Sequence, residues 1–313
     1  TINGLGASSL TISGDNGNSA RNFNIFNIDS GGNLSISNVT VSGAKTTSDS
    51  GAFNNNGTLA ITSATISSNS ANLGGGIRNN SGGILTLNNS IVSGNSASTD
   101  GGGILNPVGG TFTINNSTIS GNFAAGQGGG IVNGGTFTIN NSNISSNSAT
   151  TNGGGIFINK GSLTLTNSTL AANSANKGGG IYINTSVTPG TLNITNSTLS
   201  GNSASNSGGG IYNIGTLNIA NTIIANSTSG GDFAGAGTVN LIGSSTSANN
   251  LATQSGLSWA TTKTSAEINL GPLQDNGGPT FTMALGTGSV AIAAGNSTIS
   301  NASPVSGLDQ RGF

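Results

Sequence analysis

The sequence Gly208-Gly209-Gly210-Ile211-Tyr212-Asn213-Ile214-Gly215-Thr216-Leu217-Asn218-Ile219, followed by Asn221-Thr222-Ile223-Ile224, recurs in variant form along most of this chain. The Ile after each Gly triplet stands at Ile77, Ile104, Ile131, Ile156, Ile181 and Ile211, so successive units are 27, 27, 25, 25 and 30 residues long. The longest unit holds an insertion, residues 185–190. A fixed period of this size is the signature of a stacked-repeat architecture.

Each unit contains three short runs with β-strand character, separated by Gly, Asn and Ser. In the run from Thr111 to Asn115, Phe112 and Ile114 share one face and the polar residues share the other. Three strands in a unit without a helix indicate a coil in which each strand pairs in parallel with its equivalent one coil later. We therefore predict an all-β fold: a right-handed, single-stranded parallel β-helix (solenoid) of about 9–10 coils of ~25 residues, with a C-terminal cap.

Asn and Gly recur at fixed positions in this pattern and are predicted to build its turns. A stacked Asn can bond the next coil through its amide, and Asn tolerates left-handed backbone angles. Gly suits positions with positive φ or close backbone approach. The residues expected to form these turns and ladders are Asn95, Asn122, Asn147, Asn173, Asn202, Gly103, Gly130, Gly155, Gly180 and Gly210.

The repeat fades after about residue 245, which divides the chain into a repeat domain (1–245) and a C-terminal region (246–313). The second region contains Trp259, three of the chain's five prolines and several charged residues. Because an open solenoid end exposes unpaired strand edges, we expect residues 246–313 to form a cap. Residue 1 already lies in repeat-like sequence, so we expect the chain to be a processed or trimmed piece.

Composition excludes several classes of function. Charged residues make up 5% of the chain and the net charge is -1, so the seven Lys and Arg residues cannot form the basic stripe of a nucleic-acid binder. His and Cys are absent, which excludes disulfides and thiolate metal sites. We expect no cofactor, no metal, and no membrane-spanning segment, because no apolar run approaches about 20 residues.

The repeat resembles that of bacterial polymorphic outer-membrane proteins, through Gly-Gly-Gly-Ile-Tyr-Asn-Ile-Gly-Thr-Leu (208–217) and the Asn-Ser-Thr-Ile-Ser-Gly-Asn element (116–122). The C-terminal stretches 270–280, 288–292 and 309–312 resemble the end region of choice-of-anchor β-helix proteins. The resemblance implies a secreted or surface-anchored bacterial protein with an adhesive or structural role, and it implies no catalytic residue.

The acidic and basic residues are too scattered to predict an active site. Glycosidases need two carboxyl groups about 5–10 Å apart. Between residues 51 and 231 the only acid is Asp100. Asp275 and Asp309 are the one pair that could meet, and next to Arg311 they are expected to form an ion pair instead.

Two surfaces remain as candidate binding sites. Phe157, Tyr182 and Tyr212 each follow an inward Ile on successive coils, so alternation places them outside as an aromatic stripe. Such a stripe could stack on sugar rings or on a partner protein; the alternative is a self-stacking ladder that stiffens the rod. Outward Thr-x-Thr pairs such as Thr111 and Thr113 suggest ice binding as a further alternative, although Asn140, Asn193 and Asn218 interrupt that array.

We therefore expect a non-enzymatic extracellular or cell-surface protein that serves adhesion or builds a surface layer or fibre. Its expected partners are another copy, stacked head to tail, or a cell-surface or extracellular glycan or protein. The alternatives are a carbohydrate-binding or polysaccharide-processing β-helix protein and an ice-binding solenoid.

Overall fold

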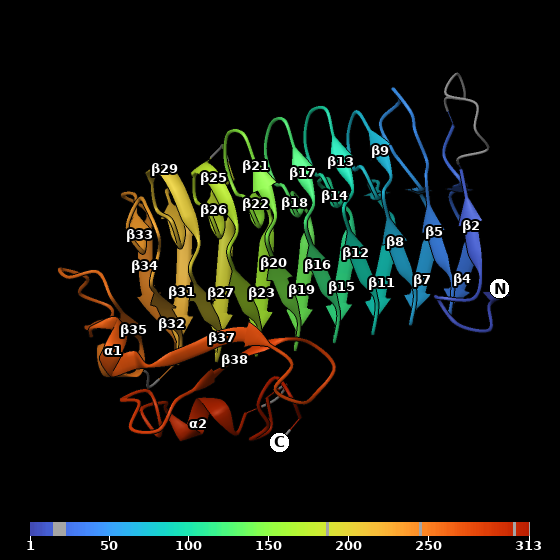
Figure 1. The fold of residues 1–313 in the computed structure, drawn as a ribbon. Coiled ribbons are helices and arrows are strands. Elements are labelled where there is room, and N and C mark those ends of the chain that lie inside the picture. Colours follow the sequence, from blue (N-terminus) through green and yellow to red (C-terminus); the bar gives the residue numbers. More distant parts are fainter. Residues whose placement is uncertain (15–22, 186–187, 244–245, 303–304, 313) are drawn as a thin grey trace.

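The chain forms a parallel β-solenoid in which coils stack into a rod (Figure 1). The computed structural model describes residues 1–14, 23–185, 188–243, 246–302 and 305–312. About nine coils of about 26 residues follow one another, and every strand pair along the rod is parallel. The predicted fold class is confirmed.

Three long sheets run the length of the rod. Sheet A consists of β1 (Ile2–Asn3), β4 (Asn33–Ser37), β7 (Thr58–Thr62), β11 (Ile84–Asn88), β15 (Thr111–Asn115), β19 (Thr136–Asn140), β23 (Ser162–Thr166), β27 (Thr191–Thr195), β31 (Thr216–Ala220) and β34 (Thr238–Leu241). Sheet B consists of β2 (Thr11–Ser13), β5 (Thr40–Ser42), β8 (Thr65–Ser67), β12 (Ile91–Ser93), β16 (Thr118–Ser120), β20 (Asn143–Ser145), β24 (Thr169–Ala171), β28 (Thr198–Ser200), β32 (Ile223–Ala225), β35 (Leu251–Ala252) and β36 (Thr261–Thr262). Sheet C consists of β3 (Phe26–Ile28), β6 (Phe53–Asn55), β10 (Ile77–Asn79), β14 (Ile104–Asn106), β18 (Ile131–Asn133), β22 (Ile156–Ile158), β26 (Ile181–Ile183), β30 (Ile211–Asn213) and β33 (Phe233–Ala234).

A fourth, shorter sheet was not predicted. Sheet D consists of β9 (Ser70–Ala71), β13 (Ser96–Ala97), β17 (Phe123–Ala124), β21 (Ser148–Ala149), β25 (Ser174–Lys177) and β29 (Ser203–Ser207). Most of its strands have only two residues, and the inward one is Ala. A Ser-Ala pair has little β propensity, so pairing with the coils on either side, rather than local preference, makes it a strand.

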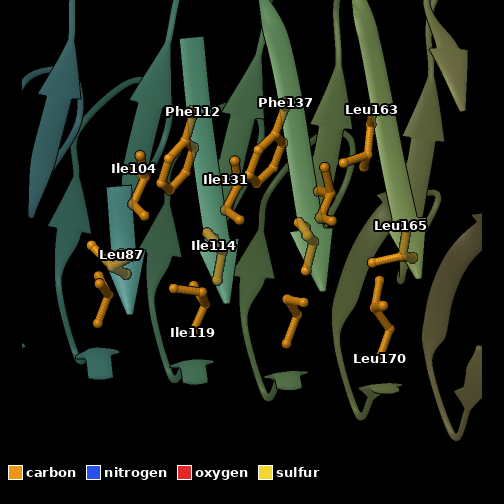
Figure 2. Close-up of a cluster of buried hydrophobic side chains, with 14 of the residues drawn as sticks. Leu87, Ile104, Phe112, Ile114, Ile119, Ile131, Phe137, Leu163, Leu165 and Leu170 are labelled. Atoms are coloured by element: carbon orange, nitrogen blue, oxygen red, sulfur yellow. The ribbon is translucent and has the colours of Figure 1, made fainter. Parts of the chain in front are cut away.

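The core is a set of aliphatic columns, one inward position above another. Figure 2 shows Ile104 and Ile131 from sheet C facing Phe112 and Phe137 from sheet A inside the rod. The two phenylalanine rings stack at 4.5 Å with an interplanar angle of 2°. Burying each large apolar side chain contributes about 1.5–3 kcal/mol. In-register pairing keeps each of these columns in line.

One residue turns the chain from sheet A into sheet B, and it has left-handed backbone angles. The φ values lie between 48° and 50° at Asn89, Asn116, Asn141, Asn167, Asn196 and Asn221. The next residue is a buried Ser in most coils, and its backbone N–H donates to the Ser hydroxyl of the following coil, as from Ser117 to Ser142 at 3.1 Å. Asn is among the residues that tolerate this conformation, which explains its recurrence at the turn.

Residues beyond 245 first close the end of the rod. A 3-10 helix (η1, Ser247–Asn249) leads into β35 and β36, which extend sheet B. Trp259 is 6% exposed and meets the ring of Phe233 edge-on, with centroids 5.1 Å apart. Helix α1 (Ser265–Ile268) follows, capped by Thr264 and Glu267, whose carboxylate accepts hydrogen bonds from Thr264 that lower its pKa. This part fits the expected cap.

The rest of the C-terminal region folds back along the flank of the rod, a placement that the sequence did not predict. This C-terminal arm (270–302 and 305–312) contains β37 (Leu270–Gln274), β38 (Thr282–Leu285) and α2 (Ser297–Ser300), and runs beneath the coils in Figure 1. Its hydrogen bonds reach Asn221, Asn196, Asn167 and Asn141 on successive coils. The arm therefore binds the edge between sheets A and B.

Replacing Trp259 with Ala is expected to lower the free energy of unfolding by about 3–5 kcal/mol, because it opens the end of the core beside Phe233. Urea unfolding followed by circular dichroism measures the loss. Trp259→Phe is the control, since it keeps most of the buried area and should cost less. Equal, small losses for both variants would show that Trp259 does not close the core.

Candidate functional site

The predicted aromatic stripe lies on the outer face of sheet C, but its rings are not free to bind a ligand. Phe157, Tyr182 and Tyr212 occupy equivalent positions of β22, β26 and β30. Their ring centroids are 5.3 and 5.1 Å apart. Phe157 is 4% exposed and Tyr182 is 8% exposed, within a second cluster that includes Leu105 and Val132. The prediction of an accessible stripe is therefore wrong for these two rings.

The burial has a structural cause that alternation does not reveal. The first Gly of each triplet lies close to the outer face of sheet C: a Cβ on Gly153 would lie 2.8 Å from the Cα of Phe157. Directly before the triplet of the next coil, the Lys177 ammonium lies 5.1 Å from the centre of the Tyr212 ring. Burial, with a smaller effect from Tyr212, raises the pKa of Tyr182. The arrangement matches the alternative of a stacked ladder.

The buried Asn residues bind each coil to the next. In the ladder of Asn69, Asn95, Asn122, Asn147, Asn173 and Asn202, each member is 1% exposed or less. The Asn122 Nδ2 donates to the Asn147 Oδ1 at 2.9 Å and to the Val92 carbonyl at 3.0 Å, so both amide hydrogens are used. The Asn122 Oδ1 accepts from the Asn95 Nδ2 and the Asn95 backbone N–H, both at 3.0 Å.

The third Gly of each triplet faces this ladder. A Cβ on Gly155 would lie 2.7 Å from the carbonyl oxygen of Gly180 and 3.1 Å from the amide carbon of Asn173. Gly103, Gly130, Gly180 and Gly210 would suffer a similar contact with the backbone of the following coil. At this position Gly permits the close approach of coils.

A second buried Asn ladder escaped the sequence analysis. It links Asn55, Asn79, Asn106 and Asn133 at the ends of sheet C strands, through Nδ2 to Oδ1 bonds of 2.7, 2.8 and 2.8 Å. Ile158 and Ile183 take the same place on the next two coils. The sequence pattern that predicts this ladder is an Asn two positions after the inward Ile of the coil. Ile158 and Ile183 interrupt that pattern, and so it was not recognised.

The outer face of sheet A carries regular columns of mostly polar side chains, and we call it the sheet A face. Its first column is Thr58, Ile84, Thr111, Thr136, Ser162, Thr191, Thr216 and Thr238. Its middle column includes Thr86, Thr113, Thr138, Thr164, Asn193, Asn218 and Asn240. Hydrogen bonds of 2.7 and 2.9 Å between their side-chain amides hold the last three residues in line.

The chemistry of the sheet A face is that of hydroxyl and amide groups. These groups both donate and accept hydrogen bonds and carry no charge. They repeat at the strand spacing of about 4.8 Å. Such a face can make many equivalent, weak contacts with an extended polar surface.

Two ion pairs of the described residues involve side chains outside the sheet A strands. Arg78 pairs with Asp49 and, together with the Asn72 amide, lowers the Asp49 pKa. Arg311 Nε donates to Asp309 at 2.7 Å, as expected, whereas Asp275 accepts from the backbone of Gly277. In the part of the chain that the structure describes, no three His, Cys, Asp or Glu side chains gather as metal ligands would. Nor is any helix there long and apolar enough to cross a membrane.

Among the described residues, Asp232 is the one buried carboxylate, with 2% of its surface exposed. Its oxygens accept from the backbone N–H groups of Ser227, Thr253 and Gln254 and from the Thr253 hydroxyl, at 2.6–3.1 Å. These bonds fasten the last coil to the segment that closes the rod, which indicates a structural role.

Comparison of the chain with protein families, with curated proteins and with solved structures finds no match.

Replacing Asn122 with Ala is expected to destabilise the rod by about 3 kcal/mol or more, because it leaves two buried donors of Asn95 without their acceptor. The matched control is Asn218→Ala, which breaks a ladder on the half-exposed sheet A face, where water replaces the lost bonds. That variant should lose less than about 1 kcal/mol. Urea unfolding compares them, and equal losses would contradict the assigned importance of the buried ladder.

Replacing Tyr182 with Ser is expected to lower the free energy of unfolding by about 3 kcal/mol or more, because it removes a buried ring from between Phe157 and Tyr212. Tyr182→Phe keeps the ring and serves as the control, with a loss near zero. Thermal unfolding of both variants decides the point. A Tyr182→Ser chain as stable as the parent would restore the ring to the candidate ligand-binding residues.

Proposed function

We propose that this chain is a non-enzymatic adhesive and structural rod that works outside the cell or at the cell surface, and that the sheet A face is its contact surface. The observation that carries the proposal is the repetition of hydroxyl and amide side chains at one position of coil after coil. The partner class that suits this face is a neutral glycan polymer, whose hydroxyl groups donate and accept in the same way.

Rigidity supports an adhesive role. The columns of the sheet A face are held from behind by the aliphatic core, so little side-chain or backbone freedom is lost on contact. Each hydroxyl contributes weakly to binding, and affinity arises from many simultaneous contacts along the rod. A partner surface must therefore be extended to be held firmly.

The absence of charge on this face fits a neutral partner better than an acidic one. An acidic polysaccharide or a nucleic acid is recognised chiefly through Lys and Arg, and the chain has seven such residues in 313. The resemblance of the repeats to bacterial surface proteins supports the same location and role. Catalysis is not part of the proposal, because neighbouring carboxylates are not found on the sheet A face.

Ice binding is a second candidate, favoured by one feature. Thr86, Thr113, Thr138 and Thr164 form an uninterrupted column over four coils, and Thr111 and Thr136 stand beside it. A flat array of Thr can order water in a fixed pattern. Thermal hysteresis in a solution of the chain tests this candidate, and freezing without hysteresis rejects it.

The glycan proposal is tested by co-sedimentation of the chain with insoluble neutral polysaccharides such as cellulose, chitin and mannan. The triple variant Thr113→Ala, Thr138→Ala and Thr164→Ala removes three hydroxyls from the middle column. We expect it to bind at least about tenfold more weakly to whichever polymer retains the parent chain, since each lost hydrogen bond weakens binding by about 0.5–1.5 kcal/mol.

The matched control is the triple variant Ser96→Ala, Ser148→Ala and Ser174→Ala, which removes three hydroxyls from sheet D and should bind as the parent does. Equal retention of both triple variants would reject the sheet A face as the contact surface. Negative-stain electron microscopy of the same samples over a range of concentrations shows the form of the rod. Dispersed rods support the adhesive role, whereas regular filaments would favour a structural subunit.

A further inference from the structure

A cavity of about 400 Å³ lies between the flank of the rod and the C-terminal arm. Three successive sheet B strands, β12, β16 and β20, form one wall together with the turns before them. The loop between β37 and β38, at Pro279, Thr280 and Phe281, forms the other. Its volume is within the range of small-molecule sites in proteins, about 300–1,000 Å³.

The lining combines an apolar spot with uncharged polar groups. Ile91 stands where the neighbouring coils have Thr65 and Thr118, and it is 43% exposed. Phe281, across the cavity, is 54% exposed. The other lining side chains are mostly Asn, Ser and Thr, and none of the described residues that line the cavity is ionised.

Asn143, on the rod wall, has a buried side-chain amide with one end lacking a hydrogen-bond partner in the part of the chain that the structure describes. It is 2% exposed, and its Oδ1 accepts from the Ser145 hydroxyl at 2.7 Å. Among the described residues, its Nδ2 has no partner. If the Asn143 amide were rotated by 180°, its nitrogen would face Ser145 and its oxygen would lack a partner instead. In either orientation one end of the amide needs a further hydrogen-bonding atom. Buried amides are normally fully bonded, which makes this one a candidate ligand contact.

The arm fixes the position of the Phe281 wall before any ligand arrives. The Thr280 hydroxyl donates to the Asn141 carbonyl at 3.2 Å. The Gln310 Nε2 donates to the Thr280 hydroxyl at 2.8 Å and to the Phe281 carbonyl at 3.3 Å. The backbone beneath the exposed ring is therefore held to the rod, and a ligand need not order it.

We propose that this cavity is a discrete binding site for a neutral oligosaccharide. The apolar face of a sugar ring packs on Phe281 and Ile91, and its hydroxyls bond the Asn143 amide and the neighbouring Asn and Thr groups. Acidic sugars are disfavoured, because the lining supplies no cation to pair with a carboxylate. The assignment shares only its ligand class with the proposed adhesive role, and the site does not include the sheet A face.

Isothermal titration calorimetry of the full chain tests the site with soluble tetrasaccharides of glucose, mannose, xylose and N-acetylglucosamine, and with tetragalacturonate as the acidic comparison. We expect at least one neutral tetrasaccharide to bind and tetragalacturonate not to bind. Phe281→Ala should weaken the binding about tenfold or more. Asn143→Thr, which installs the residue of the adjacent coils, should weaken it by a similar factor while keeping the fold.

The matched control is Phe123→Ala, which removes a 45% exposed Phe from sheet D and should leave affinity unchanged. Phe281→Tyr keeps an aromatic ring at this position and should retain binding. Weaker binding by Phe281→Ala can then be assigned to the missing ring rather than to a displaced arm. The site is overturned if no neutral tetrasaccharide binds at millimolar concentration, if Phe281→Ala and Asn143→Thr bind as tightly as the parent, or if tetragalacturonate binds best. The sheet A triple variant should leave this titration unchanged, so failure of either proposal is visible separately.

Discussion

The structure depends on one constraint: the buried Asn side chains of the rod bond to partners on the coil above or below, at the strand spacing of about 4.8 Å. The Asn ladder through Asn122 meets it with both ends of each amide. Gly155 and its equivalents meet it by letting backbones approach. A change of register by one residue would break the polar columns and misalign the apolar ones together. Consequently equivalent residues keep their position within the coil more strictly than the coils keep their length.

Much of this architecture follows from the sequence because its causes are local and periodic. An Ile after each Gly triplet and a Thr-x-Thr-Ile run fix which side chains point inward, and Ile156, Ile181 and Ile211 are all fully buried. The outward direction of Phe157 and Tyr182 was also predicted. Their burial was not, because alternation identifies the face of a strand but not the loop that covers it.

The C-terminal arm and the cavity beside it lie outside the reach of periodic reasoning. Nothing in the local sequence around Phe281 indicates that it will lie near Asn143, more than a hundred residues earlier in the chain. The contacts that bring them together, such as Gln310 with Thr280, join segments without repeat partners. The sheet A face, in contrast, could be predicted from the Thr-x-Thr runs, although Asn193 and Asn218 in its middle column were interpreted only as interruptions.

The arm also divides the rod into two mechanical parts. It fastens the coils from Asn141 to Asn221 to one another through bonds that cross coil boundaries. The coils before them are held chiefly by their immediate neighbours, as in a one-dimensional array. Under pulling force or heat, unfolding should therefore begin among the early coils and stop at the coils that the arm holds together. A molecule attached at its C-terminal end would therefore stay attached through folded coils while the coils at the other end unfold.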